Sequence, residues 1–598
     1  MRIEEQIVRE GVFMEIYKKL GWFFKDKWKS YTFAILALLG VAFLQLIPPR
    51  IIGIIIDEIS DNVITSESLI QWLLILAVTA ILQYIFRYIW RVNIWGNAAK
   101  LEQIIRSRLY KHFTNMDSEF YQKYRTGDLM AHATNDLRAI RMVAGGGIVT
   151  LADSLSITII TITTMFILID WRLTLLAIIP LPLLAVASRY LGRMLHARFR
   201  SAQDAFSQMN NKVQESIQGV KVIKTFGQEQ EDIEEFHVQT DNILDKNKEV
   251  YKVDSLFDPA LTIIIGASYV IAIIVGGNLI VSGEITVGDF VTFISYIGML
   301  VWPMYAIGRL FNIIERGSAS YDRVELLLNE GSSIIERKNA VNELPDGDLV
   351  FNIDSFKYPD SDKVTLENIN ITIPKGKTLG IVGKTGAGKS TLLKLLLRDH
   401  DHYKGNIKFD GIDIRDYTLD ALLKSVGYVP QDTFLFSTSI RDNIRFSNPT
   451  LPEEQVKEAA KLADIHEDIM EMPKGYDTET GERGVSLSGG QKQRVSIARA
   501  LIKNPELMIL DDSLSAVDAK TEEEILSGLK ELREDQTTII IAHRISSLMH
   551  ADEIVVLEDG KIIERGTHAE LIAQNGWYNE MYNKQQLEQQ VPSIGEGE

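Results

Sequence analysis

Six runs of roughly 20 mostly apolar residues lie in the first half of the chain, and they constrain its fold more than any other feature. A helix of that length can cross the hydrocarbon core of a bilayer with every backbone group hydrogen-bonded inside the segment. Pro48-Pro49 should kink the first run or end a helical segment there. A soluble helical bundle would not account for six such runs. We therefore expect spans at Tyr31–Ile56, Leu69–Val92, Ile148–Ile169, Arg172–Leu191, Ala260–Val281 and Val287–Ile307.

Two long polar stretches separate these runs, at residues 100–147 and 192–258, and both have a helical pattern. They are rich in Arg and Lys, so the positive-inside rule predicts that they lie in the cytoplasm. An even number of spans then places both termini there as well. Residues 1–30 are expected to form an interfacial elbow helix, because apolar and aromatic residues are mixed with lysines between Met14 and Lys29. A plain basic juxtamembrane stretch is the alternative.

The second half of the chain has the composition of an ordinary α/β domain. With 598 residues, two or more domains are expected. We predict a transmembrane domain over residues 31–320, a linker over 321–348, an α/β domain over 349–589 and a disordered tail over 590–598. The net charge of −17 argues against a nucleic-acid partner. The absence of cysteine excludes disulfides, thiolate metal sites and a cysteine nucleophile.

A glycine-rich octet follows the buried-strand pattern Thr378–Val382 and leads into a helical run. Strand, glycine loop and helix form the context that a phosphate-binding loop requires. The loop amides and the positive end of the helix dipole suit the phosphates of ATP. Lys389 should reach the β- and γ-phosphates, and the Ser390 hydroxyl should ligate Mg²⁺. The predicted ATP-binding residues are Gly383, Lys384, Thr385, Gly386, Ala387, Gly388, Lys389, Ser390 and Thr391.

A second strand pattern, Leu507–Leu510, ends in Asp511 and Asp512. Ligand groups sit at the carboxyl ends of such strands, so Asp511 is placed to hold Mg²⁺ directly or through water. A capping role for Asp511 is the weaker alternative.

Between these two elements stands Leu487-Ser488-Gly489-Gly490-Gln491, the signature of ATP-binding-cassette (ABC) proteins. From about Met14 to Gln589 the chain resembles a bacterial ABC exporter half-transporter, in which six spans are fused to one nucleotide-binding domain. That resemblance implies an α-helical transmembrane domain with long cytoplasmic helices, joined to an α/β P-loop domain. It also implies ATP and Mg²⁺ as cofactors, and a multi-pass protein of the bacterial plasma membrane whose nucleotide-binding domain is cytoplasmic.

The resemblance assigns roles to further residues. Tyr358 resembles the aromatic that stacks on adenine, and Gln431 the glutamine that ligates Mg²⁺ and senses the transmembrane domain. His543 resembles the histidine at the γ-phosphate, and Asp518 lies in the loop that crosses the dimer interface. In the family the signature binds ATP held by the opposite chain, which implies binding in trans by Leu487, Ser488, Gly489, Gly490, Gln491 and Asp518. Phe120-Tyr121 with Gly127–Leu129, and Glu215–Phe226, resemble the coupling-helix regions that dock on the nucleotide domains.

Asp512 departs from the family pattern, in which a catalytic Glu follows the Mg²⁺ aspartate. Asp is shorter by one C–C bond, about 1.5 Å of reach, and misplacing a catalytic group by about 1 Å can cost on the order of 10²-fold in rate. This degenerate Walker B resembles that of one chain of the heterodimeric multidrug exporters. The expected partner is a homologous half-transporter with Glu at this position and an altered signature. A slow but symmetric homodimer is the alternative.

The transported substrate is less constrained. The resemblance favours export of small amphipathic drugs, with a lipid or lipopeptide exporter as the rival and an ATP-gated channel or regulator as a further alternative. Aromatic and methionine side chains could line a promiscuous cavity, and a carboxylate inside a span is a functional candidate, although helix packing would explain most of them. The candidates are Asp153, Phe293, Tyr296, Met299, Trp302 and Tyr305.

Overall fold

The computed structural model of the protein describes residues 15–359, 361–532 and 535–590. The chain forms two compact units. The helical unit contains residues up to 115 and residues 125–330, and the α/β unit contains residues 116–124 and everything after 330. The predicted tail, residues 590–598, lies outside the described residues except for Gln590, as does the start of the predicted elbow segment.

Six helices of the described chain are long and apolar enough to cross a membrane, as the sequence predicted. The first predicted span is broken before its proline pair: α3 (Trp28–Gln45) ends, and α4 (Ile47–Ser60) begins with the prolines in its first turn. Proline is tolerated in the first turn of a helix, because the N–H group that it lacks would have no hydrogen-bond partner within the helix there. The short helix α2 (Gly21–Asp26) lies within the predicted elbow segment.

The spans continue as long helices well beyond the length of a bilayer crossing. The helical unit also contains α5 (Ser66–Thr114), α7 (Thr126–Ala131), α8 (Leu137–Met142), α9 (Ile148–Leu168), α10 (Trp171–Ile178), α11 (Leu181–Gln218), α12 (Val220–Phe226), α13 (Glu229–Asp254), α14 (Phe257–Val281) and α15 (Val287–Asn329). Two π-helical turns, His132–Asp136 and Val143–Gly147, join α7, α8 and α9. Capping boxes formed by Thr65 with Ser68 and by Thr286 with Asp289 start α5 and α15.

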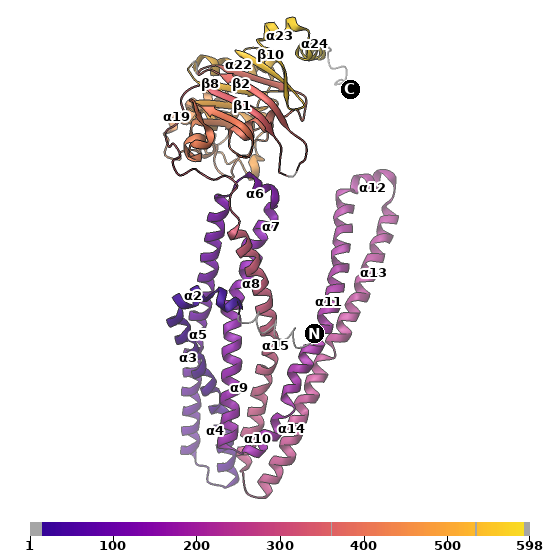
Figure 1. The fold of residues 1–598 in the computed structure, drawn as a ribbon. Helices are drawn as coiled ribbons and strands as arrows, with labels where there is room; N and C mark the ends of the chain where they lie inside the picture. The colour runs from indigo at the N-terminus through magenta and orange to yellow at the C-terminus, as the bar shows by residue number, and fades with distance from the viewer. Residues whose placement is uncertain (1–14, 360, 533–534, 591–598) are drawn as a thin grey trace. The chain divides into compact units, whose positions relative to one another are not determined.

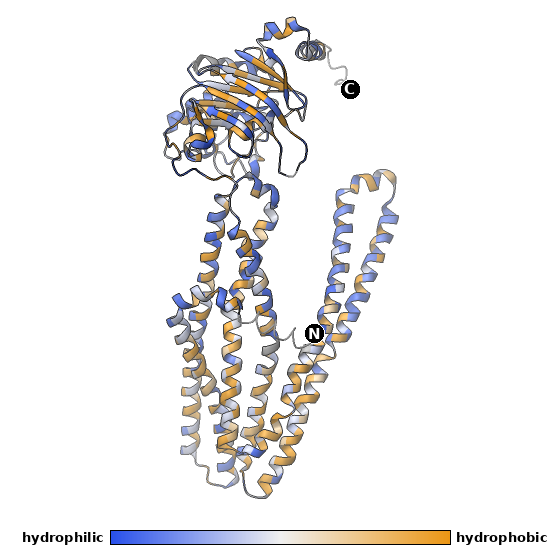
Figure 2. Ribbon diagram, in the orientation of Figure 1, coloured by the Kyte–Doolittle hydropathy of each residue, from blue (hydrophilic) through white to orange (hydrophobic). Residues whose placement is uncertain are grey.

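Helices α11 and α13 pack side by side and are joined at one end by α12 (Figure 1). Hydrophobic residues dominate α9 and α14, whereas hydrophilic residues are frequent along α13 (Figure 2). This division matches the predicted alternation of membrane spans with long polar extensions.

The α/β unit is built on two sheets. A mixed sheet has the order β10-β9-β3-β8-β7-β6, with β10 as its antiparallel edge strand, and an antiparallel sheet has the order β2-β1-β4-β5. The strands are β1 (Leu349–Phe356), β2 (Leu366–Ile373), β3 (Thr378–Gly383), β4 (Lys404–Phe409), β5 (Ile412–Asp413), β6 (Val426–Val429), β7 (Leu507–Asp511), β8 (Thr537–Ile541), β9 (Glu553–Glu558) and β10 (Lys561–Gly566).

Helices complete two separate apolar cores in this unit, one lying between the two sheets and the other among the helices that follow β6. Helix α16 belongs to the first core and α21 to the second. The helices are α6 (Ser118–Lys123), α16 (Lys389–Leu396), α17 (Leu419–Ser425), α18 (Ile440–Ile444), α19 (Glu453–Leu462), α20 (His466–Glu471), α21 (Gly489–Leu501), α22 (Ala519–Leu532), α23 (His568–Gln574) and α24 (Trp577–Gln590), with 3₁₀ turns at Ile414–Asp416, Gly475–Asp477, Glu482–Gly484 and Ser546–Leu548.

Candidate functional site

The glycine loop connects the central strand β3 to α16, as predicted. Gly383 has φ +154° and Gly388 has φ +101°, a region of backbone conformation that side chains disfavour. A Cβ atom on Gly383 would lie 2.1 Å from the carbonyl oxygen of Leu557 in β9. The close approach of two central strands therefore demands glycine at this position.

Lys389, the first residue of α16, bends back over the loop. Its Nζ donates to the carbonyl oxygens of Gly383 at 2.7 Å and Lys384 at 3.0 Å. Burial lowers the pKa of this amine, and the nearby carboxylates of Asp511 and Asp512 act in the opposite direction. The ammonium group is thus held where a loop-bound phosphate chain would need a counter-charge.

Asp511 ends β7, between β6 and β8, and its side chain is buried. Burial raises the pKa of this carboxyl, while hydrogen bonds from the Tyr428 hydroxyl, at 3.4 Å, and from Ser390 lower it. A buried carboxylate beside a hydroxyl is a set of hard oxygen donors that fits Mg²⁺. A divalent cation held there would offset the burial of the carboxylate and would neutralise phosphate charge.

Asp512 follows in a left-handed conformation with φ +49°, and its N–H donates to the carbonyl oxygen of Ile541 at 2.7 Å. Gln431 Nε2 donates to Asp512 Oδ2 at 3.2 Å. The structure therefore brings together Gln431 and Asp512, which lie 81 positions apart in the sequence. The end of strand β7 thus places two carboxylates next to each other, and the second, Asp512, contacts the predicted sensor glutamine, Gln431.

Tyr358 lies next to α16. Its hydroxyl is 3.0 Å from Thr391 Oγ1, and the Lys394 ammonium lies 5.8 Å from the ring centroid. Its ring contacts those of Phe356 and His400. Tyr358 is thereby fixed to the helix that carries the phosphate loop, and adenine stacking remains a prediction for it.

The signature opens α21. Ser488 is the N-cap, and it forms a capping box with Gln491, which also donates to Asp468 at 3.0 Å. A Cβ atom on Gly490 would lie 3.0 Å from the Ala516 carbonyl oxygen, so the helix start packs closely on the Ser515–Asp518 loop. Within the described part of the chain, no hydrogen bond or ion pair joins the signature to the phosphate loop.

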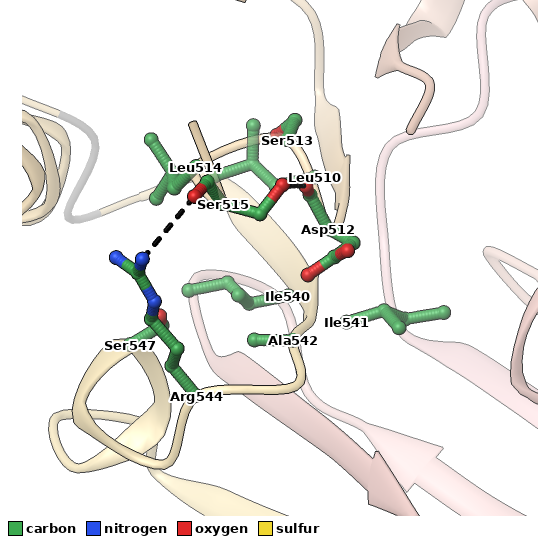
Figure 3. A pocket seen from close by; sticks show the side chains of 10 residues that line it. All are labelled: Leu510, Asp512, Ser513, Leu514, Ser515, Ile540, Ile541, Ala542, Arg544 and Ser547. Carbon is green, nitrogen blue, oxygen red and sulfur yellow. Dashed lines mark hydrogen bonds between the residues drawn. The ribbon is translucent and has the colours of Figure 1, made fainter. Parts of the chain in front are cut away.

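The loop after Asp512 is fixed by residues that sequence reasoning missed. Gln493 accepts from the Ala516 N–H at 3.0 Å. Arg544 donates to the carbonyl oxygens of Ser515 at 3.2 Å and Val517 at 3.3 Å. A pocket between this loop and β8 is lined by Leu510, Asp512, Ser513, Leu514, Ser515, Ile540, Ile541, Ala542, Arg544 and Ser547 (Figure 3). In the sequence, only the position of Arg544 directly after His543 could have indicated that it lies near the site.

The two remaining predicted residues, Asp518 and His543, lie immediately before α22 and shortly after β8, respectively. Asp518 caps the start of α22 by accepting from the Thr521 N–H at 3.1 Å. His543 follows β8, its side chain is exposed, and its carbonyl oxygen accepts from Gln585 Nε2 at 2.8 Å. An exposed histidine at this strand end is free to meet a ligand, and its role stays a prediction.

The candidate cavity residues divide by burial. Phe293 and Tyr296 are fully buried in the core of the helical unit, and Tyr296 donates to the Leu46 carbonyl oxygen at 2.8 Å. Their placement favours helix packing, the alternative to a cavity role. Trp302 and Tyr305 are exposed, with ring centroids 6.1 Å apart. Met299 packs at the edge of the same core, and Asp153 lies half-buried on α9.

Comparison with known proteins agrees with this geometry. Residues 31–304 match the ABC transporter transmembrane region, and residues 366–515 match the ABC transporter domain. The chain is 45% identical over 96% of its length to 98% of "Probable multidrug resistance ABC transporter ATP-binding/permease protein YheI" of Bacillus subtilis (strain 168). It is 41% identical over 96% of its length to 97% of "Multidrug resistance-like ATP-binding protein MdlA" of Escherichia coli (strain K12).

A solved structure, described as a bacterial Atm1-family ABC exporter with ATP bound, aligns with a TM-score of 0.76 and 26% identity over 93% of this chain and 99% of that one. The two-unit architecture and the six spans are therefore those of an exporter with fused transmembrane and ATP-binding domains. The chain belongs to the ABC transporter family, as a multi-pass exporter of the bacterial plasma membrane with a cytoplasmic ATP-binding domain.

Proposed function

We propose that this chain exports hydrophobic or amphipathic drugs as one half of a heterodimer, and that its own ATP site hydrolyses slowly. The partner would be a second, homologous half-transporter. The observation that carries the proposal is Asp512, which occupies the position after the Mg²⁺ aspartate and engages Gln431 through its carboxylate. The relatives named as multidrug resistance proteins support the drug substrates.

The short side chain of Asp512 is the reason for slow hydrolysis. A Glu here would extend the carboxylate by about 1.5 Å, toward a water that must attack the γ-phosphate. Retracting a water-orienting group by that amount costs about 10²-fold in rate. Nucleotide binding depends on other groups, namely Lys389, Asp511 and Tyr358, all of which stand beside the loop or its helix.

Two features of the single chain support a partner of the same architecture. Among the described residues, no hydrogen bond or ion pair joins the signature at the start of α21 to the phosphate loop of its own chain, so the signature is available to ATP held by a second chain. The turn α12 exposes Val222 and Phe226, with 60% and 73% of their surfaces accessible. Apolar residues at the tip of a long hairpin suit docking on another nucleotide-binding domain. Of the first predicted coupling region, Phe120-Tyr121 groups with the α/β unit of its own chain, whereas Gly127–Leu129 belongs to the helical unit.

Co-purification from the native host tests the heterodimer. The affinity-tagged chain, extracted in mild detergent, should bring down a second half-transporter that has Glu after its Mg²⁺ aspartate and an altered signature. Recovery of this chain alone, as a dimer, would support a symmetric homodimer and refute the proposal. Drug-stimulated ATP hydrolysis by the recovered pair then tests the substrate class, with lipids and lipopeptides as the competing stimulants.

ATP turnover separates the two sites. With the partner's catalytic Glu changed to Gln, we expect turnover near background, because only the Asp512 site remains. Asp512→Glu in this chain should raise turnover only in part, since the partner's altered signature still faces that site. Asp512→Asn is the matched control that removes the charge and keeps the length. Full recovery with Asp512→Glu would show that the side-chain length is the whole defect.

A further inference from the structure

Two histidines and a glutamate meet within the α/β unit, outside the ATP site. Glu119 lies in the first turn of α6, while His400 and His402 lie in the segment between α16 and β4. One potential ligand atom from each residue lies within 4.8 Å of the others. The cluster therefore joins the coupling segment, residues 116–124, to the body of the unit.

His400 is the most constrained of the three. Its side chain is fully buried against the rings of Phe356 and Tyr358, and its Nε2 has no hydrogen-bond partner among the residues that the structure describes. Its Nδ1 lies 3.2 Å from Glu119 Oε1. Burying an imidazole whose polar contact is to one carboxylate lowers the stability of the fold unless that contact is strong.

The two distances from Glu119 to the histidine nitrogens match those between ligands of one metal ion. Nitrogen and oxygen ligands held at about 2.0–2.1 Å in a tetrahedron lie roughly 3.3 Å from each other. His400 Nδ1 and His402 Nδ1 lie 3.2 Å and 3.6 Å from the same oxygen of Glu119. His402 is partly exposed, with 44% of its side chain accessible, so an ion and a water could enter from solvent.

We propose that Glu119, His400 and His402 form a binding site for a divalent transition-metal ion, with Zn²⁺ as the best match. Two imidazoles and a carboxylate, with a fourth position open to water, form a donor set that zinc accepts. Mg²⁺ is disfavoured because it prefers oxygen ligands in an octahedron, and two of the three donors here are nitrogens. The exclusion of thiolate sites by the lack of cysteine stands, since none of these ligands is a thiol.

The site would act as a clamp on the coupling segment. Besides Glu119, that segment is held by Asp117, which accepts from the hydroxyls of Ser332 and Ser333 at 2.8 Å each. A bound ion would add a tie between α6 and the segment that packs on Tyr358, the predicted adenine-stacking residue. Metal occupancy would thereby stiffen the link between coupling segment and nucleotide site.

Zinc titration of the full chain tests the site. The purified, nucleotide-free protein is stripped with chelator and titrated with Zn²⁺ against a chromogenic competitor. We expect one saturable site per chain, weakened at least tenfold by His402→Ala and by Glu119→Gln. Both variants alter accessible or isosteric positions, which protects folding. His237→Ala, an exposed histidine on α13, is the matched control and should leave affinity unchanged.

Two further readouts separate ligation from a structural role. Co²⁺ bound in place of Zn²⁺ should give the intense visible absorption of a tetrahedral site, and that absorption should vanish in His402→Ala. Zn²⁺ should slow amide hydrogen exchange in residues 118–123 of the unaltered protein and leave it unchanged in that variant. Absence of saturable Zn²⁺ binding, or equal affinity in all variants, would overturn the proposal.

Discussion

Gly383→Ala should destabilise the α/β unit far more than Gly386→Ala, although both replace a glycine of the phosphate loop. At Gly386, φ is +83° and, apart from the glycine and its two chain neighbours, no described residue lies within 4 Å of the added methyl group. The cost there is that of a left-handed alanine, about 1–2 kcal/mol. At Gly383 the methyl group would lie 2.1 Å from the Leu557 carbonyl oxygen, so backbone must move in addition to the unfavourable φ of +154°.

The difference in magnitude follows from what must move. Van der Waals contact between carbon and oxygen needs more than 3 Å, so β3 and β9 would have to separate by about 1 Å in the middle of the sheet. Such overpacking typically costs about 1–3 kcal/mol, which adds to the backbone strain of about 1–2 kcal/mol. We therefore expect about 3–4 kcal/mol for Gly383→Ala.

Urea unfolding without nucleotide measures this difference. Trp577, the one tryptophan of the sequence after residue 330, packs on the second core and reports on this unit. With an m-value of about 2–3 kcal/mol per molar, Gly383→Ala should lower the midpoint by about 1 M or more, and Gly386→Ala by about half a molar. Equal shifts for the two variants would refute the reasoning, because they would show that strand packing at Gly383 is not the deciding contact.

Three other substitutions test individual interactions. Lys389→Ala should weaken ATP binding by about 10- to 100-fold in an equilibrium assay, since a charge-assisted contact contributes about 1.5–3 kcal/mol. Tyr296→Phe removes the hydrogen bond from the tyrosine hydroxyl to the Leu46 carbonyl oxygen and should lower stability by about 1 kcal/mol, a shift of about 2–4 °C in thermal unfolding. Burial raises the Asp413 pKa, but Arg415 hydrogen bonds outweigh this and leave it lowered. The resulting stabilisation of the folded state is complete above the unfolded-state pKa of about 4, and it is lost as the pH falls further. Asp413→Asn should therefore remove this part of the pH dependence when unfolding is measured between about pH 2 and 7. An unchanged pH dependence in the variant would contradict the assignment to Asp413.

The local elements of the fold were predictable because their signals are local. The break of the first span before Pro48-Pro49 follows from the missing N–H groups of proline, and the strand β1 was predicted with the bounds Leu349–Phe356 that the structure shows. The phosphate loop was recognisable because its glycines, lysine and serine stand at fixed spacing between a strand and a helix. The candidate cavity was less predictable, since an aromatic residue on an apolar helix packs or lines a cavity according to its neighbours.

The sequence by itself determined the six spans, the α/β class of the second half, the phosphate loop and the place of Asp512 after Asp511. Only the tertiary structure decided that Gln431 meets Asp512, that Arg544 fixes the following loop, and that Glu119 reaches His400 from 281 positions away. Periodicity and spacing record each segment's own conformation and which face it buries. They do not record which distant segment will cover that face, because that choice depends on the strand order and on packing of the whole unit.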